Sequence, residues 1–271
     1  MNDVKRIIIV LLGLVVLSLC AFSIKGHIET EGYKTQVNYV TAIKTSEKDN
    51  FNYAVDSRQG RVLTNGQFTA DKKLAQFDEM TKGFTYVKRT QEHYTRHTYT
   101  TCSKNSCTTH VYYSWDSVGH DEKYASKVTY FDRQYNTNIF GFQNMLQKVD
   151  ACDVTKKDTN TGWFHEKHGC SKSWDTGYYY LDNNDRYYYE IVPTKFTATF
   201  ITDTYSGSLK PLNQDNIVLE NKSIDQVLVD VGKYHLWAFW ALVIVLFVLT
   251  CIACYIAYTW VMADGIFSLN R

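Results

Sequence analysis

The sequence predicts an α+β domain rich in antiparallel sheet, placed outside the cytoplasm between two transmembrane helices. Three observations lead to this prediction. Two long uncharged apolar stretches lie near the ends of the 271-residue chain. Four cysteines fall in the region between them, and short β-rich runs outnumber helical patterns in that region. Residues 25–235 therefore form the expected extracytoplasmic domain.

The first apolar stretch covers residues 7–24 and follows Lys5 and Arg6. Basic residues before an apolar run place the amino terminus in the cytoplasm. The same pattern is typical of a signal peptide, and Ala21 and Ser23 offer small residues for cleavage. Because the run is longer than a typical signal core, we favour a retained transmembrane helix, or uncleaved signal anchor.

The second apolar stretch covers residues 236–263 and also lacks charge. About 20 helical residues are enough to cross a hydrocarbon core of about 30 Å. Trp237 and Trp260 lie near its two ends, where interfacial aromatic residues are expected. The span holds no ionisable group suited to an ion pathway, which favours an anchor over a pore. The tails 1–6 and 264–271 would then be cytoplasmic.

The charge of the domain excludes some partners. Three of the 29 basic residues and two of the 28 acidic residues lie outside residues 25–235, which leaves 26 of each sign in the domain. A neutral domain lacks the basic surface of a nucleic-acid binder, so we expect no nucleic-acid partner. The expected partners are the lipid bilayer and a protein outside the cytoplasm, and a homo-oligomer is also possible.

The four cysteines of the domain are expected to form two disulfides, because extracytoplasmic compartments are oxidising. Four cysteines allow three pairings. We predict Cys102–Cys107 and Cys152–Cys170. The first pair flanks a four-residue loop between two β-rich runs, so its members would face each other in a hairpin.

A zinc site is the alternative reading of the second cysteine pair. His165 and His168 precede Cys170 closely, and Cys152 could complete a set of two cysteines and two histidines. The spacing matches no familiar zinc module, so we favour the disulfide.

Along the domain, apolar alternation predicts a strand over 33–43. Helical spacing predicts helices over 69–83 and 139–149. A final amphipathic helix is expected around residues 224–231. The remaining β-rich runs are 84–100, 108–115, 127–131, 176–181, 186–192 and 195–204.

Three histidines form the densest titratable group. The predicted hairpin places Tyr99 opposite His110, His97 opposite Tyr112 and His93 opposite Asp116, all on one face. His93, His97 and His110 could bind zinc or copper, but a solvated hairpin face is the favoured interpretation, with no metal. The opposite face is expected to point into the core. It carries Tyr94, Val111, Tyr113 and Trp115.

The stretch "YYYLDNNDRYYY", residues 178–189, predicts a second hairpin with Asn183 and Asn184 in a two-residue turn. That register pairs Tyr180 with Tyr187. It directs Tyr178, Tyr180, Tyr187 and Tyr189 inward, and leaves an outer face as the predicted partner-binding surface. The residues of that surface are Tyr179, Arg186 and Tyr188.

No catalytic signature is present: the sequence has no nucleophile elbow, no zinc-protease helix and no phosphate-binding glycine loop. We therefore predict a protein that is not an enzyme and needs no cofactor. "VYYSWDSVG", "KVTYFDRQYNTNIFGF" and "RYYYEIVPTKFTATFITD" resemble uncharacterised two-span envelope membrane proteins of tailed bacteriophages and their bacterial hosts. The resemblance implies an envelope protein made during infection and transfers no functional residue.

These observations predict an integral envelope protein whose outer domain binds a protein partner, such as one that controls lysis or blocks superinfection. Two alternatives remain open at this stage. The two-span topology also suits a channel or receptor-like subunit, and the histidines would suit an extracytoplasmic metalloenzyme.

Overall fold

The computed structural model describes residues 26, 36–104, 106–157, 168–170, 175–212, 215–232, 240–249, 251, 252 and 255. The chain divides into a larger unit, Ile43–Ile224, and a smaller unit formed by the segments on either side of it. The predicted span 7–24 and most of 236–263 lie outside the described residues. Within the described residues, no helix has both the length and the apolar character needed to cross a membrane.

The smaller unit is mainly helical where it is described. Residues 36–41 form a helix in which the Thr41 hydroxyl donates to the Val37 carbonyl, so the strand predicted over 33–43 is wrong for this part. A strand needs a neighbour to satisfy its backbone, whereas a helix satisfies its own. Residues 33 to 35 lie outside the described residues. The predicted amphipathic helix is confirmed, because residues 224–232 are helical.

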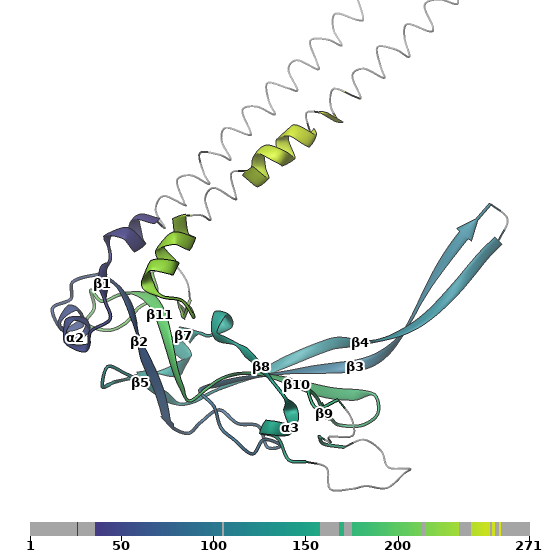
Figure 1. Ribbon diagram of the computed structural model, residues 1–271, viewed down its shortest axis with the longest axis horizontal. Coiled ribbons are helices and arrows are strands. Elements are labelled where there is room, and N and C mark those ends of the chain that lie inside the picture. Colours follow the sequence, from purple (N-terminus) through teal and green to yellow (C-terminus); the bar gives the residue numbers. More distant parts are fainter. Residues whose placement is uncertain are drawn as a thin grey trace, which may run out of the picture. The chain divides into compact units, whose positions relative to one another are not determined.

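The larger unit is α+β and built mainly from antiparallel sheet, as predicted (Figure 1). In its first sheet, β2 (Arg61–Lys72) pairs along one edge with β11 (Lys195–Asp203). Its other edge pairs in parallel with β1 (Ile43–Thr45) and antiparallel with β5 (Lys127–Tyr130). β5 in turn pairs with β6 (Arg133–Asn136). The short helix α2 is Lys48–Asp56.

The second sheet has the order β4, β3, β10, β8, with β9 beside β10. Its two longest strands are β3 (Tyr86–Ser103) and β4 (Ser106–Tyr124). The others are β8 (Gln147–Val149), β9 (Tyr179–Tyr180) and β10 (Asp185–Val192). Strands were thus predicted in the right places for β3, β4, β5, β9, β10 and β11, whereas β2 and β6 were missed.

The helix predicted over 69–83 is wrong. Residues 69–72 complete β2, which has strand partners on both edges. The chain then runs irregularly, with isolated bridges from Ala75 to Phe84 and from Met80 to Thr155. Gly83, expected to end the helix, instead packs against Leu74, where an added Cβ would lie only 2.5 Å from the Leu74 Cβ. Tertiary strand pairing has overridden local helical spacing.

The helix predicted over 139–149 is also wrong. The segment contains two 3₁₀ turns, η1 (Thr137–Ile139) and η2 (Gln143–Met145), with strand β7 (Phe140–Gly141) between them. β7 pairs with β12 (Ile217–Val218) and β8 pairs with β10. These partners take backbone groups that a helix would need for itself. The buried hydrophobic side chains of this segment are Phe140, Phe142 and Met145, a spacing that does not follow one face of a helix.

Two hydrophobic clusters hold the larger unit together. The first surrounds Phe68 of β2, whose ring contacts aromatic rings from several strands, namely Tyr130, Phe140, Phe196 and Phe200. The second lies under the other sheet and includes Tyr179, Tyr189 and Ile191 together with Phe77. It also reaches α3 (Ala151–Val154).

Candidate protein-interaction arm

β3 and β4 continue together beyond the rest of their sheet (Figure 1). β10 pairs with β3 only from Tyr86 to His93, and the Tyr94 amide then donates to the Asn184 carbonyl at 2.8 Å. Past this point the described part of the chain gives β3 no strand neighbour except β4. We call the two-stranded ribbon formed by residues 94–103 and 106–115 the arm.

The predicted register of the arm is confirmed. Tyr99 lies opposite His110, His97 opposite Tyr112, and Cys102 opposite Cys107. The disulfide Cys102–Cys107 is present and closes the ribbon near its tip. A two-stranded hairpin alone is marginally stable in water, so a covalent link at the tip helps to hold this one together.

The first face of the arm, the histidine face, carries stacked aromatic pairs. The rings of His97 and Tyr112 stack at 5.0 Å, and those of Tyr99 and His110 stack at 4.8 Å. Asp116, at its base, accepts hydrogen bonds from Ser114 at 2.8 Å and from His97 at 2.6 Å. These hydrogen bonds, that of Ser114 foremost, lower the pKa of the Asp116 carboxyl.

The structure does not gather the three histidines around one point. His93 bonds to Asp185, His97 to Asp116, and His110 to Thr101. Among the described residues, no three side chains of histidine, cysteine, aspartate or glutamate are placed to hold a metal ion. Each imidazole instead has its own partner, and the partner of His93 lies on β10.

The second face, the tyrosine–tryptophan face, does not point into the core, so this expectation is wrong. Tyr113 is 54% exposed and Val111 is 46% exposed. Tyr94 stacks on Tyr113 at 5.4 Å and contacts Trp115 at 5.1 Å. The expectation fails because β3 continues past the end of β10 beyond His93, and in the described part of the chain only the base of this face, at Trp115, is covered.

The base of this face is anchored by a buried arginine. The Arg186 guanidinium lies 4.0 Å from the centre of the Trp115 ring and 3.4 Å from that of Tyr178. Its Nε donates to Glu92 at 2.7 Å. Cation–π contact and a charge-assisted hydrogen bond together fix Trp115 where the arm leaves the sheet.

The Tyr-rich hairpin differs from prediction by one residue. Tyr180 pairs with Arg186, and Tyr179 pairs with Tyr187. The Asp182 carboxylate accepts the backbone N–H groups of Asn184 at 2.6 Å and of Asp185 at 2.8 Å. This side-chain cap stabilises a wider turn than the predicted Asn-Asn turn.

A slip of one residue exchanges the faces of one strand relative to the other. Tyr179 therefore joins Tyr187 and Tyr189 at the second hydrophobic cluster. The predicted partner-binding surface is not the wetter face, since Tyr179 is buried, Arg186 is only 8% exposed and Tyr188 is half-buried.

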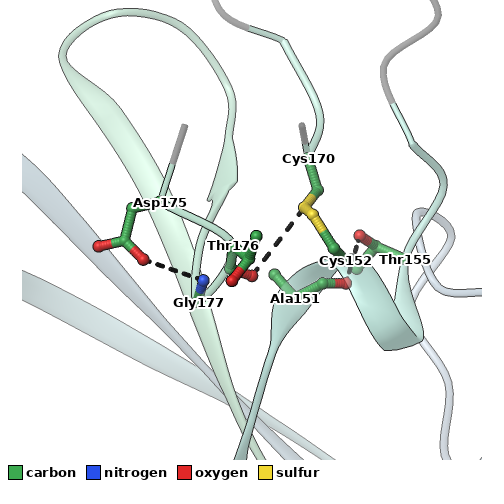
Figure 2. Close-up of a disulfide and its surroundings, with 7 residues drawn as sticks. All are labelled: Ala151, Cys152, Thr155, Cys170, Asp175, Thr176 and Gly177. Carbon is green, nitrogen blue, oxygen red and sulfur yellow. Dashed lines mark hydrogen bonds between the residues drawn. A yellow bond between two sulfur atoms is a disulfide. The ribbon is translucent and has the colours of Figure 1, made fainter. Parts of the chain in front are cut away.

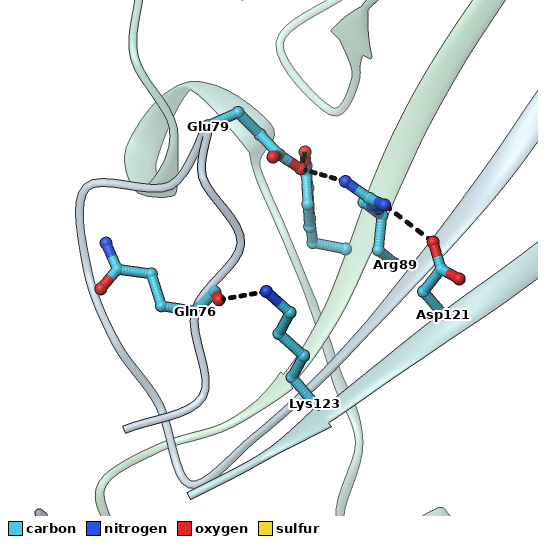
Figure 3. Close-up of polar contacts among 6 residues, drawn as sticks. Gln76, Glu79, Arg89, Asp121 and Lys123 are labelled. Atoms are coloured by element: carbon cyan, nitrogen blue, oxygen red, sulfur yellow. Dashed lines mark hydrogen bonds and ion pairs between the residues drawn. The ribbon is translucent and has the colours of Figure 1, made fainter. Parts of the chain in front are cut away.

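A second arginine secures β3 and β4 below the arm (Figure 3). Arg89 donates to Glu79 at 2.9 Å and to Asp121 at 2.7 Å. Its guanidinium also lies over the rings of Phe77 and Tyr187. The irregular segment after β2 is therefore tied to both long strands.

The other predicted disulfide, Cys152–Cys170, is also present. Figure 2 shows it beside Thr176, whose carbonyl oxygen lies 3.9 Å from the Cys170 sulfur. Because the disulfide uses both cysteine sulfurs, the zinc alternative for this pair is wrong. His165 lies outside the described residues, and the His168 ring bonds to the Leu181 carbonyl.

The two disulfides should differ in their effect on stability. Cys152 and Cys170 are 18 residues apart and Cys102 and Cys107 are 5 apart, and a longer loop loses more entropy when it is closed. We expect C152S/C170S to lower the free energy of unfolding by about 3 kcal/mol. C102S/C107S should mainly speed amide exchange in the arm. Urea unfolding and hydrogen exchange measure the two effects, and equal losses of global stability would contradict this account.

Comparison with models of protein families, with curated proteins and with solved structures finds no match to this chain.

Sequence reasoning missed the exposed arm as a site. Its signal was the length of the two runs around the cysteines, since β3 has 18 residues and β4 has 19, whereas β10 has 8. A further signal was that both faces of the arm carry threonines. A strand with one buried face usually carries apolar residues on that face and polar residues on the other.

Proposed function

We propose that this protein is an integral envelope protein whose extracytoplasmic domain binds a protein partner through the arm. The observation that carries the proposal is the exposed tyrosine–tryptophan face, held rigid at its base by Arg186 and closed at its tip by a disulfide. Exposed aromatic side chains on a preorganised support are typical of interaction hot spots.

Several features support the setting of this proposal. The uncharged stretches 7–24 and 236–263 suit membrane anchors. Two disulfides favour an oxidising compartment for the domain. The resemblance to two-span phage envelope proteins suggests a role in lysis control or superinfection exclusion, and the partner would belong to that process.

The proposal is tested by comparing arm and control variants of the full-length protein in its native membrane. We expect chemical crosslinking and quantitative mass spectrometry to recover one specific partner. Y94A/Y113A should reduce that recovery about 30-fold, as expected for a hot-spot loss of about 2 kcal/mol. Tyr53 on α2 is 65% exposed and serves as the matched control, since Y53A should leave recovery unchanged.

Two results would contradict the proposal. Recovery of the same proteins with the wild type and Y94A/Y113A would exclude the arm as the binding surface. Release of the protein from membranes by alkaline carbonate would exclude the integral anchors, because peripheral proteins are removed by this treatment and spanning helices are retained.

A further inference from the structure

The hydrogen-bond pattern of the arm shows which residues of β4 direct their backbone N–H and C=O groups away from β3. The Tyr94 amide donates to Asn184 and so points away from β4. Tyr94 and Trp115 are therefore a non-hydrogen-bonded pair, and every second pair toward the tip has the same character. The Cα atoms of Cys102 and Cys107 are 4.1 Å apart, which agrees with the close spacing of such pairs.

It follows that alternate residues of β4 direct their N–H and C=O groups outward, away from β3. These residues are Cys107, Thr109, Val111, Tyr113 and Trp115. No hydrogen bond from another described segment reaches these backbone groups. They form a regular row of donors and acceptors along the outer edge of the arm.

This edge lacks the usual protection against pairing. Natural edge strands carry lysine, proline or bulges that prevent them from joining another strand. Residues 106–115 contain no lysine, arginine, aspartate, glutamate or proline. The first charged residue is Asp116, and the ladder shifts register only near Val118. An uncharged edge without a bulge is thus confined to the arm.

We propose that this edge pairs antiparallel with the same edge of a second copy of the chain, centred on Val111. In this register Val111 lies opposite Val111 of the second copy, and Thr109 lies opposite its Tyr113. Every outward-pointing residue then meets another outward-pointing residue, because Val111 is itself one of them. The arrangement is isologous, as expected for a symmetric dimer.

The side chains of the edge favour a second copy as the occupant. The same register sets His110 opposite Tyr112 of the second copy, which allows a further pairing of aromatic rings. Asp116, the charged residue at the end of the edge, lies opposite Ser106. Hence no like charges meet, and residues 107–115 of one copy pair with the same residues of the second copy. This inference concerns self-association and does not depend on the proposed partner.

The sharpest test places charges at the centre of the pairing. Purified full-length protein is studied in detergent micelles by native mass spectrometry and fluorescence energy transfer. The wild type should be dimeric at micromolar concentration. V111K alone and V111E alone should each weaken dimerisation about 10-fold or more, because like charges meet at the symmetry axis. An equimolar mixture of V111K and V111E should restore the dimer.

A second pair of variants separates the two edges of the arm. V111P removes an outward N–H of β4 without breaking a bond to β3, so it should also weaken dimerisation about 10-fold or more. Thr98 lies opposite Val111 and its N–H points to the other edge, which makes T98P the matched control with an unchanged dimer. A monomeric wild type, an undiminished dimer in V111P, or no recovery in the charge mixture would overturn the proposal. Such results would leave the edge open to a strand from a different protein.

Discussion

Replacing Tyr189 with alanine is expected to lower the free energy of unfolding of the larger unit by about 3–5 kcal/mol. The side chain is fully buried in the second hydrophobic cluster. Its hydroxyl donates to Glu79 at 2.9 Å, and burial raises the pKa of that hydroxyl. Alanine would leave a cavity and remove one hydrogen bond from a shielded carboxylate. Such a loss is a large part of the 5–15 kcal/mol typical of a domain.

Urea unfolding followed by circular dichroism measures this loss. The neighbouring residue Tyr188 is the matched control, because it lies on the other face of β10 and is half-buried. Y188A should cost about 1 kcal/mol or less, since contacts that remain partly exposed to water contribute little. A larger loss for Y188A than for Y189A would mean that β10 presents its other face to the core.

Replacing Arg89 with methionine is expected to have a comparable effect, about 3–5 kcal/mol. Methionine keeps much of the packing against Phe77, but it leaves Glu79 without its cationic partner. The side chain of Glu79 is only 13% exposed, so its carboxylate cannot recover full hydration. A shielded charge that loses its partner is strongly destabilising.

Asp121, the second carboxylate bound by the Arg89 guanidinium, supplies the control for this prediction. Asp121 is 63% exposed, and D121N should cost about 1 kcal/mol or less because water screens the exposed pair. Adding E79Q to R89M should regain part of the lost stability by removing the unpaired charge. If D121N proved as harmful as R89M in chemical denaturation, the account of a shielded Glu79–Arg89 pair would be wrong.

The largest strands were predictable because their signals are local and continuous. β3, β4, β10 and β11 lie in runs rich in tyrosine, valine, threonine and isoleucine. The false helix over 69–83 arose because Phe77 and Met80 are buried at helical spacing without being in a helix. Spacing along the chain reports which residues are buried, but not which backbone partners they have.

The two hairpins show what the sequence by itself determined and what only the tertiary structure decided. The arm's register followed from the sequence, since the two cysteines and the short loop between them permit few alternatives. In the Tyr-rich hairpin, the cap from Asp182 and the burial of Arg186 against Glu92 and Trp115 select a different turn. Exposure of the arm was also a tertiary outcome. It depends on where β10 stops supporting β3, and a burial pattern cannot be assigned to a strand until its neighbours are known.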